Sequence, residues 1–259
     1  MMSAEDRGQM RCVVLGKACQ VVDLSYPLNG STIFWPGGEG FKLCMNTCRN
    51  EEHGYDYAAG VFTCSEHGGT HVDAPYHFKL DGKTVDQIPL TDLMGSCKVL
   101  EVTKQCNIDA NYTLQPEDIL AFEQQYGALG LGDIVLVRTG WHRKYSQGAA
   151  EYLGYDEKTQ GPYTDSVVLR FPSIGKEAAE MLVARNVTAV GLDTASIDPG
   201  YSKDFIVHQV LLGAGIYGVE NINGNIDLLP PCGSTLMIMP MKITGGSGAP
   251  ARVVAFLDT

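Results

Sequence analysis

The sequence predicts a single α/β domain built around a mixed β-sheet. Strand-like runs rich in Val, Ile and Leu recur along the whole chain. Clear helix signals occur in only two places, so strands and helices do not alternate strictly, as they would in a doubly wound parallel sheet. The chain has 259 residues, of which 44% are hydrophobic and 19% charged, which is enough to bury the core of one large domain.

Six runs have the composition of β-strands. We expect strands over residues 21–25, 98–103, 133–139, 188–193, 234–241 and 251–257. The first residues of the chain lack a long apolar run. We predict an N-terminal extension over residues 1–19 and one domain over residues 20–259.

The first helix is predicted over residues 116–127. Pro116 suits the first turn, where its missing N–H is not needed, and two acidic residues follow it at the positive end of the helix dipole. Gly127 marks the stop.

The second helix is predicted over residues 173–186, with Ser173 as the N-cap and Asn186 as a left-handed C-terminal residue. Between the two helices, residues 146–162 are rich in Gly, Pro and charge. We expect a long surface loop there.

The net charge argues against two classes of binding partner. A net charge of −11, from 19 basic and 30 acidic residues without a basic run, argues against nucleic acid and anionic membranes. The apolar runs are too short to span a bilayer.

The eight cysteines form no CxxC pair, so we expect free, mostly buried thiols. The start lacks the apolar region of a signal peptide, which predicts a cytoplasmic location, or secretion if a leader precedes this sequence.

The stretch HGGTHVDAPYHF crowds half of the six histidines into one short segment. Its glycines disfavour a helix and permit a turn after His67, and the following residues favour an extended piece. Residues two apart on a strand share a face, so His71 and Asp73 should point the same way. The turn can then bring His67 beside them, before Pro75 fixes the chain ahead of His77.

Two imidazoles and a carboxylate are a donor set that Zn²⁺ and Mn²⁺ both accept. His67, His71 and Asp73 are therefore the predicted ligands. Three protein ligands leave room for water or substrate, as in a catalytic site. His77 is then a base close to the ion, because a histidine takes and returns protons near neutral pH.

A second cluster lies downstream. His208 and Glu220 fall in the run from residue 191 to residue 224, and Asp73 could bridge two ions if both side chains joined it. A His and a Glu at this spacing occur often, so the pair is weak evidence when taken alone.

The glycines of this run spell G-x-G-x-x-G, but a dinucleotide site needs a strand before them and a helix after them. The flanking residues predict neither, so we reject an NAD site.

Both clusters resemble one family. HGGTHVDAPYHF is similar to the H-x-G-T-H-x-D-x-P-x-H signature of the cyclase-like metal hydrolases, which include bacterial kynurenine formamidases and isatin hydrolases. The run GLDTASIDPGYSKDFIVHQVLLGAGIYGVENI also resembles this family, as do the early DLSYPL and FWPGGEG. The resemblance extends from about residue 21 to residue 257.

The resemblance implies a fold and residue roles. The fold would be an α/β domain of the swivelling β/β/α type, with a barrel-like mixed sheet and flanking helices. His67, His71 and Asp73 match the ligands of a first ion, Asp73, His208 and Glu220 those of a second, and His77 the catalytic histidine. Formamidases of the family are described with zinc and isatin hydrolases with manganese. Family members are usually homodimers or homotetramers.

The expected activity is hydrolysis of a small aryl amide. A bound divalent ion would polarise the carbonyl and lower the pKa of water, while His77 would transfer protons. A set of aromatic side chains could form a flat slot for the aryl group or simply belong to the core: Phe34, Trp35, Tyr76 and Phe78.

N-Formylkynurenine is the favoured substrate, and opening of the cyclic amide isatin to isatinate is the alternative. A protein that binds a metal or a small ligand without turnover is a third possibility.

Overall fold

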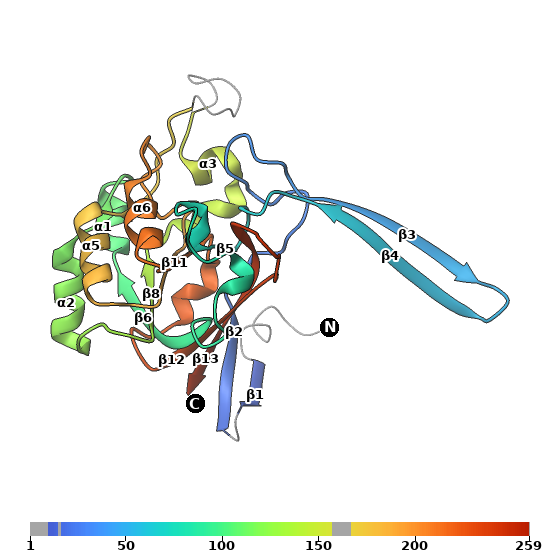
Figure 1. The fold of residues 1–259 in the computed structure, drawn as a ribbon, viewed down its shortest axis with the longest axis horizontal. Helices are drawn as coiled ribbons and strands as arrows, with labels where there is room; N and C mark the ends of the chain where they lie inside the picture. Colours follow the sequence, from blue (N-terminus) through green and yellow to red (C-terminus); the bar gives the residue numbers. More distant parts are fainter. Residues whose placement is uncertain (1–9, 15–16, 157–166, 259) are drawn as a thin grey trace.

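The computed structural model describes residues 10–14, 17–156 and 167–258 (Figure 1). Its centre is a closed ring of seven strands, in the order β13–β12–β6–β8–β10–β11–β5, because β5 pairs back to β13. Four neighbours, β6, β8, β10 and β11, are parallel, and the other pairings are antiparallel. The ring strands are β5 (His71–Asp73), β6 (Met94–Glu101), β8 (Asp133–Arg138), β10 (Ala189–Leu192), β11 (Tyr217–Glu220), β12 (Ser234–Pro240) and β13 (Gly248–Asp258). The predicted mixed, barrel-like sheet is confirmed.

The long strand β13 pairs with two different strands along the same edge. Its first residues pair with β5 and so close the ring, whereas its last residues pair with β2 (Lys17–Asp23). The strand β1 (Met10–Val14) pairs with β2 and lies outside the ring. The boundary predicted between residues 19 and 20 falls inside β2.

Helices cover the outside of the ring. They are α1 (Thr103–Ile108), α2 (Pro116–Tyr126), α3 (Ala149–Leu153), α5 (Lys176–Ala184) and α6 (Ile206–Gly213). Short 3₁₀ turns are η2 (Pro75–His77), η3 (Val85–Gln87), η4 (Trp141–Gln147) and η5 (Gly224–Leu228). Figure 1 shows α2, α5 and α6 on one side of the barrel. No helix in the described ranges is both long and apolar enough to cross a membrane.

The strand β8 shows how the core is divided. Ile134 and Leu136 join a cluster formed mainly by strand residues, whereas Val135 and Val137 join a cluster with α2, α5 and α6. Because successive side chains of a strand point to opposite faces, this buried strand contributes side chains to both clusters. This explains its continuous apolar run.

The predicted helices are confirmed, with one error in a cap. The helix α2 is followed by Gly127 at φ 97°, and Asn186 after α5 is left-handed at φ 58°. The N-cap of α5 is Gly175, not Ser173. Ser173 is wrong as a cap because it lies in the short strand β9 (Ser173–Ile174), which pairs with β7 (Thr113–Leu114).

The predicted surface loop over residues 146–162 is partly wrong. Its first part contains the end of η4 and the helix α3, where Tyr152 and Leu153 are fully buried. Residues 157–162 of that loop lie outside the described part of the chain.

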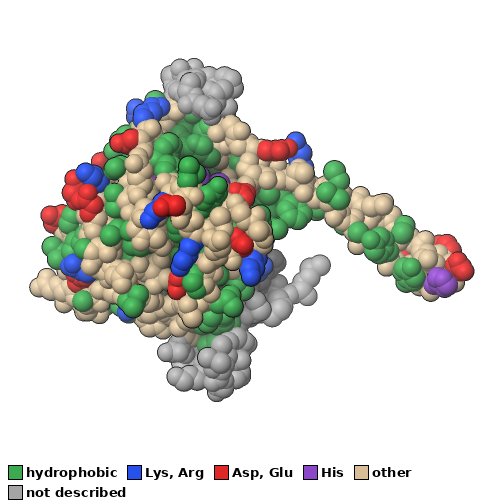
Figure 2. Space-filling view, viewed as in Figure 1, with side chains coloured by type: hydrophobic (Ala, Val, Ile, Leu, Met, Phe, Trp, Pro, Cys, Tyr) green, Lys and Arg blue, Asp and Glu red, His purple; other side chains and the backbone are tan. Residues whose placement is uncertain are grey.

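A long hairpin, which we call the arm, projects from the barrel. It consists of β3 (Lys42–Asn50) and β4 (Tyr55–Thr63), paired over their whole length (Figure 1). Large apolar side chains on it are exposed, and Val61 reaches 72%. Figure 2 shows these side chains along the extended arm. The arm was not predicted from the sequence.

Candidate metal centre

The turn before β5 folds as its glycines predict. Gly69 has a φ of 58°, and Gly68 pairs with Phe34 in an isolated bridge. A Cβ added to Gly68 would lie 2.0 Å from Cδ1 of Phe34, so no other residue fits there without displacing the ring. The turn brings His67 back to the face of β5 that carries His71 and Asp73.

The first three predicted ligands meet at Asp73. Its Oδ1 atom lies 2.6 Å from Nδ1 of His67 and 3.3 Å from Nε2 of His71. His71 and Asp73 are buried, and His67 is half-buried. Ligand atoms of the three side chains lie within 4.8 Å of one another, a spacing that one ion can bridge.

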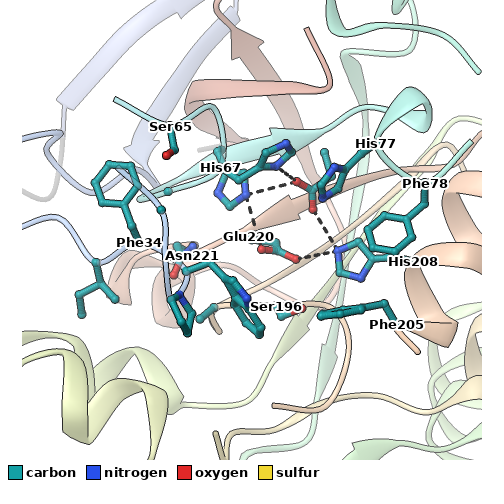
Figure 3. Close-up of a pocket in the computed structure, with 18 residues that line it drawn as sticks. Phe34, Ser65, His67, His77, Phe78, Ser196, Phe205, His208, Glu220 and Asn221 are labelled. Atoms are coloured by element: carbon teal, nitrogen blue, oxygen red, sulfur yellow. Dashed lines mark hydrogen bonds and ion pairs between the residues drawn. The ribbon is translucent and has the colours of Figure 1, made fainter. Parts of the chain in front are cut away.

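His208 and Glu220 reach the same place from other elements. The strand β11 pairs with β5 so that Glu220 is directly opposite His71, and α6 supplies His208. Nε2 of His208 lies 3.4 Å from Oε1 of Glu220 and 3.5 Å from Oδ2 of Asp73. Asp73, His208 and Glu220 thus form a second group with metal-binding spacing, sharing Asp73 with the first. Figure 3 shows His67, Glu220 and His208 close together in the pocket.

The cluster fits a cation. Oδ2 of Asp73 is buried and has no hydrogen-bond partner in the described part of the chain. Burial and the nearby Asp73 carboxylate raise the pKa of Glu220. Burial alone would lower the pKa of His71, but the Asp73 and Glu220 carboxylates and the Gly69 carbonyl together outweigh it and raise the pKa to about 9. Two buried carboxylates therefore attract positive charge, which imidazole protons or a divalent ion can supply.

The outer nitrogens of two histidines are held in place. Nδ1 of His71 lies 2.9 Å from the Gly69 carbonyl, and Nδ1 of His208 lies 2.6 Å from Oδ2 of Asp198. The Asp198 carboxylate also accepts the backbone N–H groups of Val207 and His208 at the start of α6. These contacts direct Nε2 of both rings toward the carboxylates, as partners of metal-binding histidines do.

His77, at the end of η2, lies beside this cluster. Its ring stacks on that of His67, with centroids 3.9 Å apart and planes inclined by 21°. Burial is the main cause that lowers its pKa to about 4, and the neighbouring imidazoles add to it. His77 is therefore neutral at pH 7 and lines the same pocket as the cluster.

The pocket has a volume of about 310 Å³ and an aromatic wall. Of the four aromatic residues predicted to bind substrate, Phe34, Trp35 and Phe78 line it, whereas Tyr76 does not. Phe205, which the sequence reading missed, completes the wall, with its ring centroid 5.8 Å from that of Phe78. Its only sequence signal is its place three residues before His208.

Polar residues of the pocket were also missed. Ser65, Ser196 and Asn221 line it. Asn221 directly follows Glu220 and has a φ of 57°, so the chain leaves β11 through a left-handed residue. The G-x-G-x-x-G motif nearby runs from the last residue of α6 into β11, which is the reverse of the strand–glycine–helix order of a dinucleotide site.

Comparison with known proteins gives consistent matches. The Cyclase family model matches residues 22–199. A kynurenine formamidase of Salinibacter ruber is 32% identical over 234 residues, covering 90% of this chain and 96% of that protein. An isatin hydrolase of Roseibium aggregatum is 29% identical over 210 residues, covering 78% and 75%. The solved structure of isatin hydrolase A from Ralstonia solanacearum has a TM-score of 0.78 and 30% identity, and the match covers 92% of both chains.

Proposed function

The chain belongs to the Cyclase family, and from this membership we propose that it is a metal-dependent amidohydrolase acting on a small aryl amide. The favoured reaction is hydrolysis of N-formylkynurenine to kynurenine and formate. One observation carries the proposal: five side chains with the spacing of metal ligands and a neutral histidine line one aromatic pocket. An open pocket beside the cluster supports catalysis over a closed structural site.

The metal-binding roles are assigned as follows. His67, His71 and Asp73 would hold a first divalent ion, and Asp73, His208 and Glu220 a second, with zinc or manganese suiting these donors. A bound ion would polarise the amide carbonyl and make water a stronger nucleophile at neutral pH.

His77 is the proposed proton-transfer residue. Its ring is neutral at pH 7, so an unprotonated ring nitrogen can accept a proton from the attacking water. The same nitrogen then returns the proton to the departing amine nitrogen as the C–N bond breaks. The water oxygen remains on the acyl carbon, and the products are an aryl amine and a carboxylic acid, which releases its proton to solvent as the carboxylate forms.

The aromatic wall would hold the aryl ring of the substrate. Phe34, Trp35, Phe78 and Phe205 line the pocket, and an aryl group gains from stacking on aromatic rings. They also exclude water from the reacting carbonyl, which strengthens electrostatic interactions in the pocket.

Opening of isatin to isatinate is the second candidate reaction. Its support is the structural match to isatin hydrolase A with a TM-score of 0.78. The test is a side-by-side assay of formylkynurenine and isatin, with the metal content measured by elemental analysis. Turnover of neither compound by protein that contains metal would contradict the proposal.

We also propose that the protein is a homodimer or a larger homo-oligomer joined through the arm. A two-stranded hairpin is at best marginally stable alone in water, and this one has no charged residue from Leu43 to Cys48 or from Tyr57 to Ser65. Its tip is mainly acidic, with Glu51 and Glu52, which disfavours an anionic membrane. A two-fold partner would cover both arms at once.

A cytoplasmic location completes the proposal. Cys44 and Cys48 on the arm are free and exposed. Exposed free thiols suit a reducing compartment. Cell fractionation tests this part, and recovery of the protein outside the cytoplasm would contradict it.

A further inference from the structure

His67 is oriented differently from the other two histidines of the cluster. His71 and His208 direct Nε2 toward the carboxylates, whereas His67 directs Nδ1, 2.6 Å from Oδ1 of Asp73. Its opposite nitrogen, Nε2, therefore points away from the cluster. The partner of that nitrogen comes from the segment Thr244–Gly248, far along the chain.

A hydrogen-bonded chain fixes this nitrogen. Nε2 of His67 lies 2.9 Å from Oγ of Ser247, and that hydroxyl donates to Oε2 of Glu66 at 2.6 Å. The backbone N–H of Ser247 donates to the same carboxylate oxygen at 3.1 Å. Because a carboxylate only accepts, the single hydroxyl proton of Ser247 goes to Glu66. Oγ of Ser247 must then accept from Nε2–H of His67.

The consequence concerns the tautomer of His67. With its proton on Nε2, a neutral imidazole has its free lone pair on Nδ1, the nitrogen that faces Asp73. The segment also packs tightly on the ring. A Cβ added to Gly248 would lie 2.5 Å from Cε1 of His67 and 2.4 Å from the Val72 carbonyl. The small residues of TGGSG thus let the chain come close enough for Ser247 to reach Nε2.

We propose that Ser247 and Glu66 are positioning residues that fix the orientation and tautomer of His67 for binding a divalent cation through Nδ1. This inference rests on the proposed metal site. The TGGSG segment joins β12 to β13. The inference gives it a role that was not predicted from the sequence. Outer partners of metal-binding histidines are worth roughly 10–100-fold in metal affinity.

The test is Zn²⁺ affinity, measured by competition with a chelator on metal-free protein. We expect Ser247→Ala to lower the affinity roughly 10–100-fold and Glu66→Gln to lower it in the same direction. Ser247→Thr keeps the hydroxyl and should restore most of the affinity. Ser31→Ala, which removes an exposed hydroxyl outside the pocket, is the matched control. Thermal unfolding of the metal-free variants should match that of the wild type.

A second readout tests the tautomer of His67 directly. In the Zn²⁺-loaded wild type, ¹⁵N NMR of the His67 ring should show a proton on Nε2 and none on Nδ1. Wild-type affinity in Ser247→Ala, or an Nε2 without a proton, would overturn the inference while leaving the metal site intact. Failure of the wild type to bind Zn²⁺ or Mn²⁺ would instead overturn the proposed function together with this assignment.

Discussion

Oδ2 of Asp73 lies 3.5 Å from Nε2 of His208, although one residue belongs to the barrel strand β5 and the other to the helix α6. The other oxygen of Asp73 faces His67 and His71. One carboxylate thus joins two groups of potential metal ligands. A shared carboxylate of this kind could hold two ions about 3.5–4 Å apart.

Replacing the shared carboxylate should remove both ions. We expect Asp73→Asn to contain almost no metal and to lose roughly 10³-fold or more in kcat/KM, since a metal contributes several kcal/mol to the transition state. Elemental analysis and a steady-state assay measure this. Asp81→Asn, at an exposed carboxylate, is the control and should behave as the wild type. Full metal content in Asp73→Asn would rule out the bridging role.

Glu220 should affect only the second ion. Because Glu220 belongs to the group with Asp73 and His208, Glu220→Gln is expected to bind one equivalent of Zn²⁺ where the wild type binds two. Isothermal titration of metal-free protein gives the number of ions. A wild-type stoichiometry of one would show that this second group holds no separate ion.

His77 should matter for catalysis and not for metal content. Removing a general base typically costs 10²–10⁴-fold in rate, so His77→Ala should lose activity on this scale while keeping the wild-type amount of metal. His53→Ala, on the exposed tip of the arm, is the matched control. Near-normal turnover by His77→Ala would mean that another group transfers the proton.

The aromatic wall can be tested with two neighbouring residues. Phe78 lines the pocket and Tyr76 does not, although both belong to the same short segment. Phe78→Ala should raise KM for an aryl amide roughly tenfold, since loss of one aromatic contact costs about 0.5–1.5 kcal/mol beyond its buried area. Tyr76→Ala should leave KM nearly unchanged. Equal effects of the two substitutions would count against the wall as the aryl site.

A charged residue placed on the arm should weaken the proposed oligomer. Val61 is 72% exposed, so Val61→Glu costs the isolated chain little but would place a charge in the proposed contact with a second copy. Analytical ultracentrifugation should show an oligomer for the wild type and a smaller species for Val61→Glu. Leu131→Glu, at an 83% exposed site away from the arm, is the control. A monomeric wild type would contradict this part of the proposal.

The sequence predicted most of what depends on neighbouring residues. The Gly-permitted turn and the shared face of His71 and Asp73 follow from local conformational preferences, and the turn and β5 have this geometry. The bounds of α2 follow from Pro116 and Gly127 in the same way.

What the local sequence could not predict depends on contacts between distant segments. Glu220 joins the cluster because β11 pairs with β5 in a register that puts it opposite His71, and the residues alone gave only weak evidence for it before the family resemblance was considered. Ser173 has the chemistry of a helix cap, but pairing of β9 with β7 draws it into a strand. The arm lacked a predictive pattern because both of its faces are exposed, so it shows no apolar–polar alternation.

The central claim is that side chains from β5, α6 and β11, together with His67, bind a divalent cation beside His77. The most direct test is anomalous X-ray diffraction at the zinc or manganese edge, from crystals grown with that metal. We predict one or two anomalous peaks within coordination distance of His67, His71 and Asp73, and of His208 and Glu220 if a second ion binds. The same side chains with no anomalous peak between them would contradict the claim.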